Sequence, residues 1–152
     1  MEHLATTLEV ISLASLLSGT LDLTATTTIV RIQGIPFDRL LQTIASGAFG
    51  HSAFQGGKKA ATAGLFFHFL IAFTAASIYY ASSRKLTVLL DHPLLSGLLY
   101  GVVVHLVMSR IVVPLSAAPK RKFSAKAFLT QLIIHMFCVG LPIALVVSHL
   151  SR

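Results

Sequence analysis

Four ionisable residues stand inside otherwise apolar stretches of the sequence and have side chains suited to metal, haem or proton chemistry. They are Asp22, His68, His105 and His135, and each comes from a different stretch. One carboxylate and three neutral imidazoles around a common centre form a donor set for a transition metal such as zinc, iron, copper or manganese. Two of the histidines can instead ligate a haem between helices, and the group can relay protons or ions, because histidine titrates near neutral pH. The alternative is a hydrogen-bonded polar plug that only orders the helices.

The composition indicates what surrounds these four residues. Hydrophobic residues make up 55% of the 152 residues and charged residues only 11%, against about 25% charged residues in soluble domains. This excludes an ordinary soluble enzyme and a disordered chain, and the single cysteine, Cys138, excludes an internal disulfide. The composition indicates an integral membrane protein, in which an ionisable side chain far from the interface is costly.

The hydropathy pattern predicts an all-α fold with a single transmembrane domain over residues 1–152. Four apolar stretches are long enough to cross about 30 Å of hydrocarbon as helices. They cover residues 8–29, 60–82, 94–113 and 127–147. The prediction is therefore an integral membrane bundle of four antiparallel helices.

The first loop contains a further predicted helix, over residues 36–49, because its apolar residues share one helical face. These residues are Phe37, Leu40, Leu41, Ile44, Ala45, Ala48 and Phe49. Pro36 favours the first turn of this helix and Gly50 favours its end. The helix either lies as an amphipathic helix in the bilayer interface or packs against the base of the bundle, and the pattern leaves both placements open.

The distribution of basic residues predicts the orientation in the membrane. Eight lysines and arginines fall in the first and third loops, whereas three fall in the second loop and at the C-terminus. The eight are Arg31, Arg39, Lys58, Lys59, Lys120, Arg121, Lys122 and Lys126. The positive-inside rule then places these two loops in the cytoplasm and both termini on the other side. The run Lys120, Arg121 and Lys122 is expected to anchor the chain to anionic lipid headgroups, and no nucleic-acid-binding motif accompanies it.

Two observations place the four ionisable residues at one level inside the bundle. Counted from the predicted cytoplasmic boundaries, Asp22 lies seven residues into its helix and each histidine eight, which corresponds to roughly 12 Å for all four. Each also lies on the face of its helix that carries small residues, as His105 does with Gly97 and Gly101. Small residues mark helix–helix contacts in membranes, and the pair Gly97 and Gly101 forms a GxxxG motif.

Three further charged residues near the ends of the spans are candidates for ion pairs. Glu9 and Arg84 both fall near the outer boundary, where they could pair. Arg110, near the inner end of the third span, either extends to lipid headgroups or pairs with Asp22. An ion pair between Arg110 and Asp22 would occupy the carboxylate and argue against a metal site.

Several short motifs resemble a group of small bacterial inner-membrane proteins with a similar length and number of spans. The motifs are LQTIASG (41–47), FQGG (54–57), HFLIA (68–72), VVPLS (112–116) and GLPIA (140–144). The resemblance extends over most of the chain and implies a four-helix protein of the bacterial inner membrane. It brings with it no established activity and no functional residues.

The sequence leaves three hypotheses about function. The first is a small binding or transport-type membrane protein, in which Asp22 is the anionic ligand or proton acceptor and the three histidines are neutral ligands or relay members. The second is an accessory or structural subunit that uses its glycine- and alanine-rich faces to join a homo-oligomer or a larger membrane complex. The third is an intramembrane enzyme or a haem protein, for which the sequence contains no nucleophile motif such as GxSxG.

Overall fold

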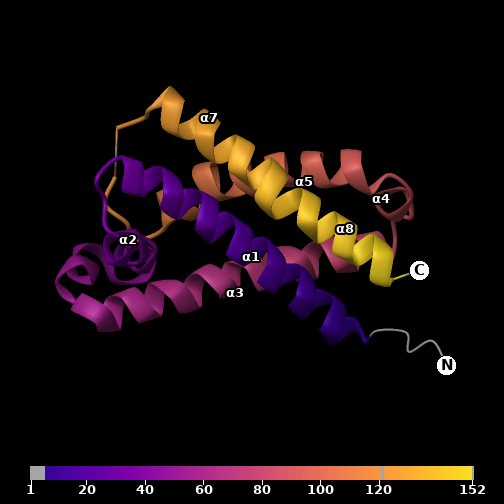
Figure 1. Ribbon diagram of the computed structural model, residues 1–152, viewed down its shortest axis with the longest axis horizontal. Coiled ribbons are helices and arrows are strands. Elements are labelled where there is room, and N and C mark those ends of the chain that lie inside the picture. Colours follow the sequence, from indigo (N-terminus) through magenta and orange to yellow (C-terminus); the bar gives the residue numbers. More distant parts are fainter. Residues whose placement is uncertain (1–5, 121, 152) are drawn as a thin grey trace.

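The computed structural model describes residues 6–120 and 122–151, and helices make up 86% of the structure with no strand among these residues. Figure 1 shows the long helices lying lengthwise beside one another, with the two ends of the chain at the same end of the molecule. The predicted all-α architecture of antiparallel helices is confirmed.

Four segments of the chain form the long helices. They are α1 (Thr7–Ile32), α3 (Gly57–Ser83), a third segment over Pro93–Leu115 and a fourth over Ala125–Leu150. The third segment consists of α5 (Pro93–Val107), η2 (Met108–Val112) and α6 (Val113–Leu115), and the fourth of α7 (Ala125–Ile134), η3 (His135–Gly140) and α8 (Leu141–Leu150). The short helices α2 (Phe37–Phe49), η1 (Gly50–Gln55) and α4 (Val88–Asp91) lie in the connections.

All four predicted spans are confirmed as apolar helices long enough to cross a membrane, with 26, 27, 23 and 26 residues. Each helix extends beyond its predicted range at both ends, and for α1 and α7 a polar cap explains the earlier start. At the start of α1, the Thr6 hydroxyl accepts a hydrogen bond from the Glu9 N–H (3.3 Å), and the Glu9 carboxylate accepts one from the Thr6 N–H (2.6 Å). At the start of α7, the Ser124 hydroxyl accepts a hydrogen bond from the Ala127 N–H (3.3 Å).

The helix predicted in the first loop is present as α2, which begins after Pro36 and ends at Gly50. Gly50 has a φ of +60°, a backbone conformation that favours glycine. Leu41 and Ala45 are buried, and the Leu41 carbonyl lies against the Cα of Gly64 in α3. Any side chain at Gly64 would overlap that carbonyl. Of the two placements left open by the sequence, the structure has α2 packed against the bundle.

The helix α1 occupies a central place, because it packs against α3 and also against η3 and α8. The backbones of α5 and the fourth segment also approach each other closely. A Cβ atom added at Gly97 would lie 2.8 Å from the Leu141 Cα, and one added at Gly101 would overlap the His135 carbonyl. The two glycines thus allow direct contact between two helical backbones, which is the geometry that GxxxG motifs permit.

An apolar core is formed by the first half of α1, the second half of α3 and the fourth segment from Val139 onward. Its buried members are Val10, Ile11, Ala14, Ala75, Ala76, Tyr79, Val139, Ile143, Ala144 and Val147. The Tyr79 hydroxyl donates a hydrogen bond to the Leu89 carbonyl (3.0 Å), so this large side chain is buried without leaving its polar atom unmatched. The four ionisable residues lie next to this core, near the middle of the long helices. They are Asp22, His68, His105 and His135.

Two wide turns interrupt the regular hydrogen bonding of the long helices, and each is followed by a proline. Both η2 and η3 are π-helical, and Pro114 and Pro142 lie two residues beyond their ends. A proline has no N–H to donate to the carbonyl four residues earlier, and its ring clashes with that carbonyl. The carbonyls concerned belong to Arg110 and Cys138, which lie inside η2 and η3. The prolines therefore explain where the wide turns occur.

Replacing Gly101 with valine is expected to lower the thermal unfolding midpoint of the purified protein in detergent. The added side chain would overlap the backbone of His135 and Met136, and overpacking of this kind costs about 1–3 kcal/mol. The matched control is Gly47→Ala, because a Cβ there would lie 3.9 Å from Ser116, an ordinary contact. An unchanged midpoint for Gly101→Val would contradict the backbone contact between α5 and η3.

Candidate functional site

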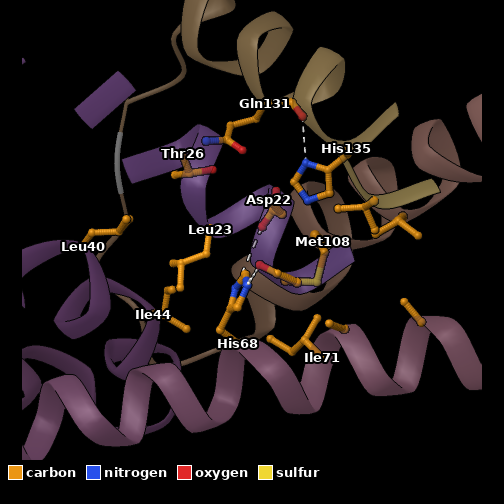
Figure 2. A pocket seen from close by; sticks show the side chains of 15 residues that line it. Asp22, Leu23, Thr26, Leu40, Ile44, His68, Ile71, Met108, Gln131 and His135 are labelled. Carbon is orange, nitrogen blue, oxygen red and sulfur yellow. Dashed lines mark hydrogen bonds and ion pairs between the residues drawn. The ribbon is translucent and has the colours of Figure 1, made fainter. Parts of the chain in front are cut away.

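A cavity of about 190 Å³ lies between α1, α2, α3, the third segment and the fourth segment. Its polar lining consists of Asp22, Thr26, His68, Gln131 and His135, and the remaining walls are mostly aliphatic. Figure 2 shows the Asp22 carboxylate in the cavity, with the imidazoles of His68 and His135 on either side of it. Three of the four ionisable residues singled out in the sequence therefore share one cavity.

The hydrogen bond made by His68 determines which of its nitrogens faces Asp22. The Nε2 atom lies 2.8 Å from the Gly19 carbonyl oxygen. A carbonyl only accepts hydrogen bonds, so Nε2 carries the hydrogen, and Nδ1 of the neutral ring has a free lone pair. This Nδ1 atom lies 3.9 Å from Oδ2 of Asp22, within ion-pair distance but too far for a hydrogen bond.

The glycine at position 19 explains how His68 reaches the backbone of another helix. A Cβ atom at Gly19 would lie 2.8 Å from the Phe69 ring and 3.3 Å from the Ala72 side chain. Only the absence of a side chain allows α1 and α3 to approach this closely. The approach brings the Gly19 carbonyl within hydrogen-bonding distance of the His68 ring.

The Asp22 carboxylate is mostly buried and only partly matched. Its side chain is 16% exposed and that of His68 is 11% exposed. The Oδ1 atom of Asp22 is buried and has no hydrogen-bond partner, although such atoms are nearly always paired in folded proteins. An unmatched carboxylate oxygen at a cavity wall indicates a place where a donor from outside the chain can bind.

His135 shows the same arrangement with its two nitrogens exchanged. Its Nδ1 atom lies 2.7 Å from the Gln131 carbonyl oxygen, one turn earlier on the same helix. The hydrogen is therefore on Nδ1, and Nε2 of the neutral ring has the free lone pair. His68 and His135 thus each donate one N–H to the backbone and keep one acceptor nitrogen.

His105 lies beside this cavity but does not line it. Its ring packs against His135, with 5.2 Å between the ring centres, and against Phe128, with 4.5 Å. The residue is 4% exposed, and its Nε2 atom is buried without a hydrogen-bond partner. The expected single layer is present as two adjoining groups, in which Asp22 and His68 face His135 across the cavity and His105 lies behind His135.

The transition-metal hypothesis requires ligand atoms that converge on one point at about 2.0–2.3 Å from the ion. Within residues 6–120 and 122–151, no group of three or more histidine, cysteine, aspartate and glutamate side chains is arranged to hold a metal ion. The donor atoms surround a cavity and do not form a coordination sphere.

The charged residues proposed for ion pairs make other contacts. The Glu9 carboxylate caps α1 through the Thr6 N–H, and an Arg84 N–H donates to the Ser151 carbonyl oxygen (3.4 Å). The Arg110 guanidinium lies 5.5 Å from the centre of the Phe128 ring. No contact among the described residues joins Glu9 to Arg84 or Arg110 to Asp22.

The basic run expected to anchor the chain lies at the start of the connection to α7. The Lys120 ammonium donates a hydrogen bond to the Pro114 carbonyl oxygen (2.6 Å), and Lys122 is exposed. Arg121 lies outside the described residues. The Lys122 side chain therefore lies on the surface at this end of the bundle, whereas the Lys120 ammonium is hydrogen-bonded to the backbone of the same chain.

Sequence reasoning missed the part that α2 and two carbonyls play in this cavity. Leu40 and Ile44, on the apolar face of α2, form part of the cavity wall. The Gly19 and Gln131 carbonyls fix the histidine tautomers. No residue pattern in the sequence specifies these two carbonyls, because every residue within a helix has a carbonyl one turn before it.

No protein-family model, no curated protein and no solved structure matches this chain. The resemblance to small bacterial inner-membrane proteins stays an expectation.

The two hydrogen bonds to carbonyls predict opposite tautomers for the neutral forms of His68 and His135. Nitrogen-15 NMR of the histidine-labelled protein, at a pH where both rings are neutral, reports which nitrogen of each ring carries hydrogen. We expect hydrogen on Nε2 of His68 and on Nδ1 of His135, because the Gly19 and Gln131 carbonyls require it. The variants His68→Gln and His135→Gln assign the signals. Hydrogen on Nδ1 of neutral His68 would contradict the bond to Gly19.

Proposed function

We propose that the chain is a membrane-spanning protein whose cavity binds a proton between Asp22 and His68 and relays it through His135. The observation that carries this proposal is the pairing of Oδ2 of Asp22 with Nδ1 of His68, at 3.9 Å, inside the bundle. Because His68 donates its other ring N–H to Gly19, both facing atoms are acceptors until one of them takes up a proton.

Physical chemistry favours a bound proton at this pair. Two acceptors that face each other in a poorly hydrated interior repel each other, and a buried polar group left unmatched costs about 1–3 kcal/mol. A proton on Nδ1 of His68 converts the contact into an ion pair with the Asp22 carboxylate. The Nε2 atom of His135, on the cavity wall, offers a further acceptor to which the proton can pass.

His105 supports an extension of the path away from the cavity. Its ring lies 5.2 Å, centre to centre, from that of His135, and its buried Nε2 atom has no hydrogen-bond partner. An unmatched imidazole nitrogen next to a second imidazole is suited to accept a proton from it. We therefore assign His105 to the step after His135.

Membrane insertion is supported by the apolar residues that each long helix turns outward. Leu16, Phe66, Leu95 and Phe137, one from each span, are 56%, 64%, 62% and 54% exposed. Exposed apolar surface along all four helices suits contact with acyl chains. The basic first and third loops favour the cytoplasmic side for the end that carries them and the opposite side for both termini. The sequence resemblance favours a bacterial inner membrane.

The orientation can be tested with single cysteines in a Cys138→Ala background. We expect Arg84→Cys to react with a membrane-impermeant maleimide in intact spheroplasts, and Lys122→Cys to react only after lysis. Both positions are exposed on the protein surface, so a difference in labelling reports the side of the membrane and not burial within the protein. Labelling of Lys122→Cys in intact spheroplasts, with protection of Arg84→Cys, would reverse the proposed orientation.

The relay is tested by proton flux into proteoliposomes driven by a potassium diffusion potential. We expect the wild-type protein to conduct protons and Asp22→Asn to conduct at least tenfold more slowly, because an amide cannot take up the proton shared with His68. His51→Gln is the control, since His51 is exposed in η1 and outside the cavity.

Two results would contradict the relay. One is equal flux in Asp22→Asn and the wild-type protein, and the other is a wild-type flux no faster than that of empty liposomes. The second result, combined with stoichiometric copurification of other membrane proteins, would support the accessory-subunit hypothesis instead.

A further inference from the structure

We infer that the same cavity binds a small organic ammonium ion, which takes the place of the proton at Asp22. The inference rests on the proposed proton site and names the class of ligand that competes for it. The binding step is an exchange without covalent change: the ammonium enters, and the proton held by Asp22 and His68 leaves to the solvent.

The cavity offers acceptors that no charged group of the chain satisfies. Oδ1 of Asp22 is buried without a partner, and Nδ1 of His68 and Nε2 of His135 keep their lone pairs. Among the described residues that line the cavity there is no lysine and no arginine. A carboxylate away from water is stabilised only by positive charge and N–H or O–H donors, so the missing group must come with the ligand.

The neutral donors of the cavity do not replace this charge. Thr26 and Gln131 contribute a hydroxyl and an amide to the lining, and each can hydrogen-bond to a ligand or to the carboxylate without neutralising it. An anionic ligand would face the Asp22 carboxylate with no compensating cation. The site therefore selects a cation over an anion of similar size.

The apolar walls select an organic cation over a hydrated inorganic one. Leu23, Ile44, Ile71, Met108 and Val139 line the cavity around the polar group. A hydrated metal ion would leave these aliphatic walls against water, whereas a hydrocarbon group on an ammonium would cover them. The volume of about 190 Å³ limits the hydrocarbon part to a small ring or a short chain.

The Tyr100 side chain joins the walls of two cavities. The Tyr100 hydroxyl donates a hydrogen bond to the Ala75 carbonyl oxygen (2.6 Å). Ala75 lines the polar cavity. Tyr100 also lines a second cavity, of about 450 Å³, between α3 and α5. Its ring and that of Tyr79 lie 4.9 Å apart, and both tyrosines line this second cavity.

The test uses benzylammonium chloride as the probe and isothermal titration calorimetry of the purified protein in detergent. Titrations in two buffers of different ionisation enthalpy count the protons released for each ligand bound. We expect saturable binding, release of up to one proton per ligand and weaker binding as the pH is lowered. Asp22→Asn should weaken binding at least tenfold, and Asp38→Asn, an exposed carboxylate in α2, should leave it unchanged.

Two further ligands keep the test independent of whether a variant folds. Benzyl alcohol has the same ring without the charge, and benzyltrimethylammonium has the charge without N–H donors. Both are expected to bind wild-type protein at least tenfold more weakly than benzylammonium. Equal binding of benzyl alcohol would overturn the inference, because it would mean that the cavity recognises only the apolar ring.

The remaining outcomes separate this inference from the proton relay. Wild-type protein that conducts protons but does not bind benzylammonium overturns the inference and leaves the relay in place. Binding without proton release overturns the exchange. Saturable binding with proton release, lost in Asp22→Asn, supports the inference even if passive proton flux is slow, in which case only the relay is contradicted.

Discussion

The structure of the cavity depends on where two imidazole N–H groups find acceptors. In an apolar helix bundle the available acceptors are backbone carbonyls, and the helix hydrogen bonds already engage most of them. His68 reaches the carbonyl of Gly19 because a glycine lets α1 and α3 approach, and His135 uses the carbonyl of Gln131. These two bonds fix the tautomers, and the tautomers turn acceptor nitrogens toward Asp22.

The fourth segment combines a helix defect with a close backbone contact to α5. The wide turn η3 begins at His135 and contains the Cys138 carbonyl, which Pro142 leaves without its regular partner. Gly101 of α5 packs against the backbone at the first residue of this turn. The position of the His135 ring is thus set by a proline downstream and a glycine on a neighbouring helix. A substitution of Pro142 or Gly101 would therefore displace the His135 ring although neither residue lines the cavity.

The spans and α2 could be predicted because hydropathy and helical periodicity are local properties of the sequence. The meeting of Asp22, His68 and His135 at one cavity was also within reach, since depth follows from the helix rise. The place of His105 was not predictable, because it depends on the angle at which α5 crosses the fourth segment. The contact of Arg110 with Phe128 depends on the same crossing. Tautomers depend on single carbonyls, which no residue pattern specifies.

The hypothesis of a purely structural polar plug explains part of this geometry, but it leaves one buried polar atom of Asp22 and one of His105 without a partner. A plug requires every buried polar atom to be matched, and the N–H groups of His68 and His135 are indeed matched by carbonyls. Oδ1 of Asp22 and Nε2 of His105 are buried and unmatched. A purely structural network would gain stability by replacing these atoms with apolar ones, since half-satisfied networks are worse than an apolar core. The unmatched carboxylate oxygen of Asp22 at the cavity therefore favours a role in which the missing donor arrives and leaves.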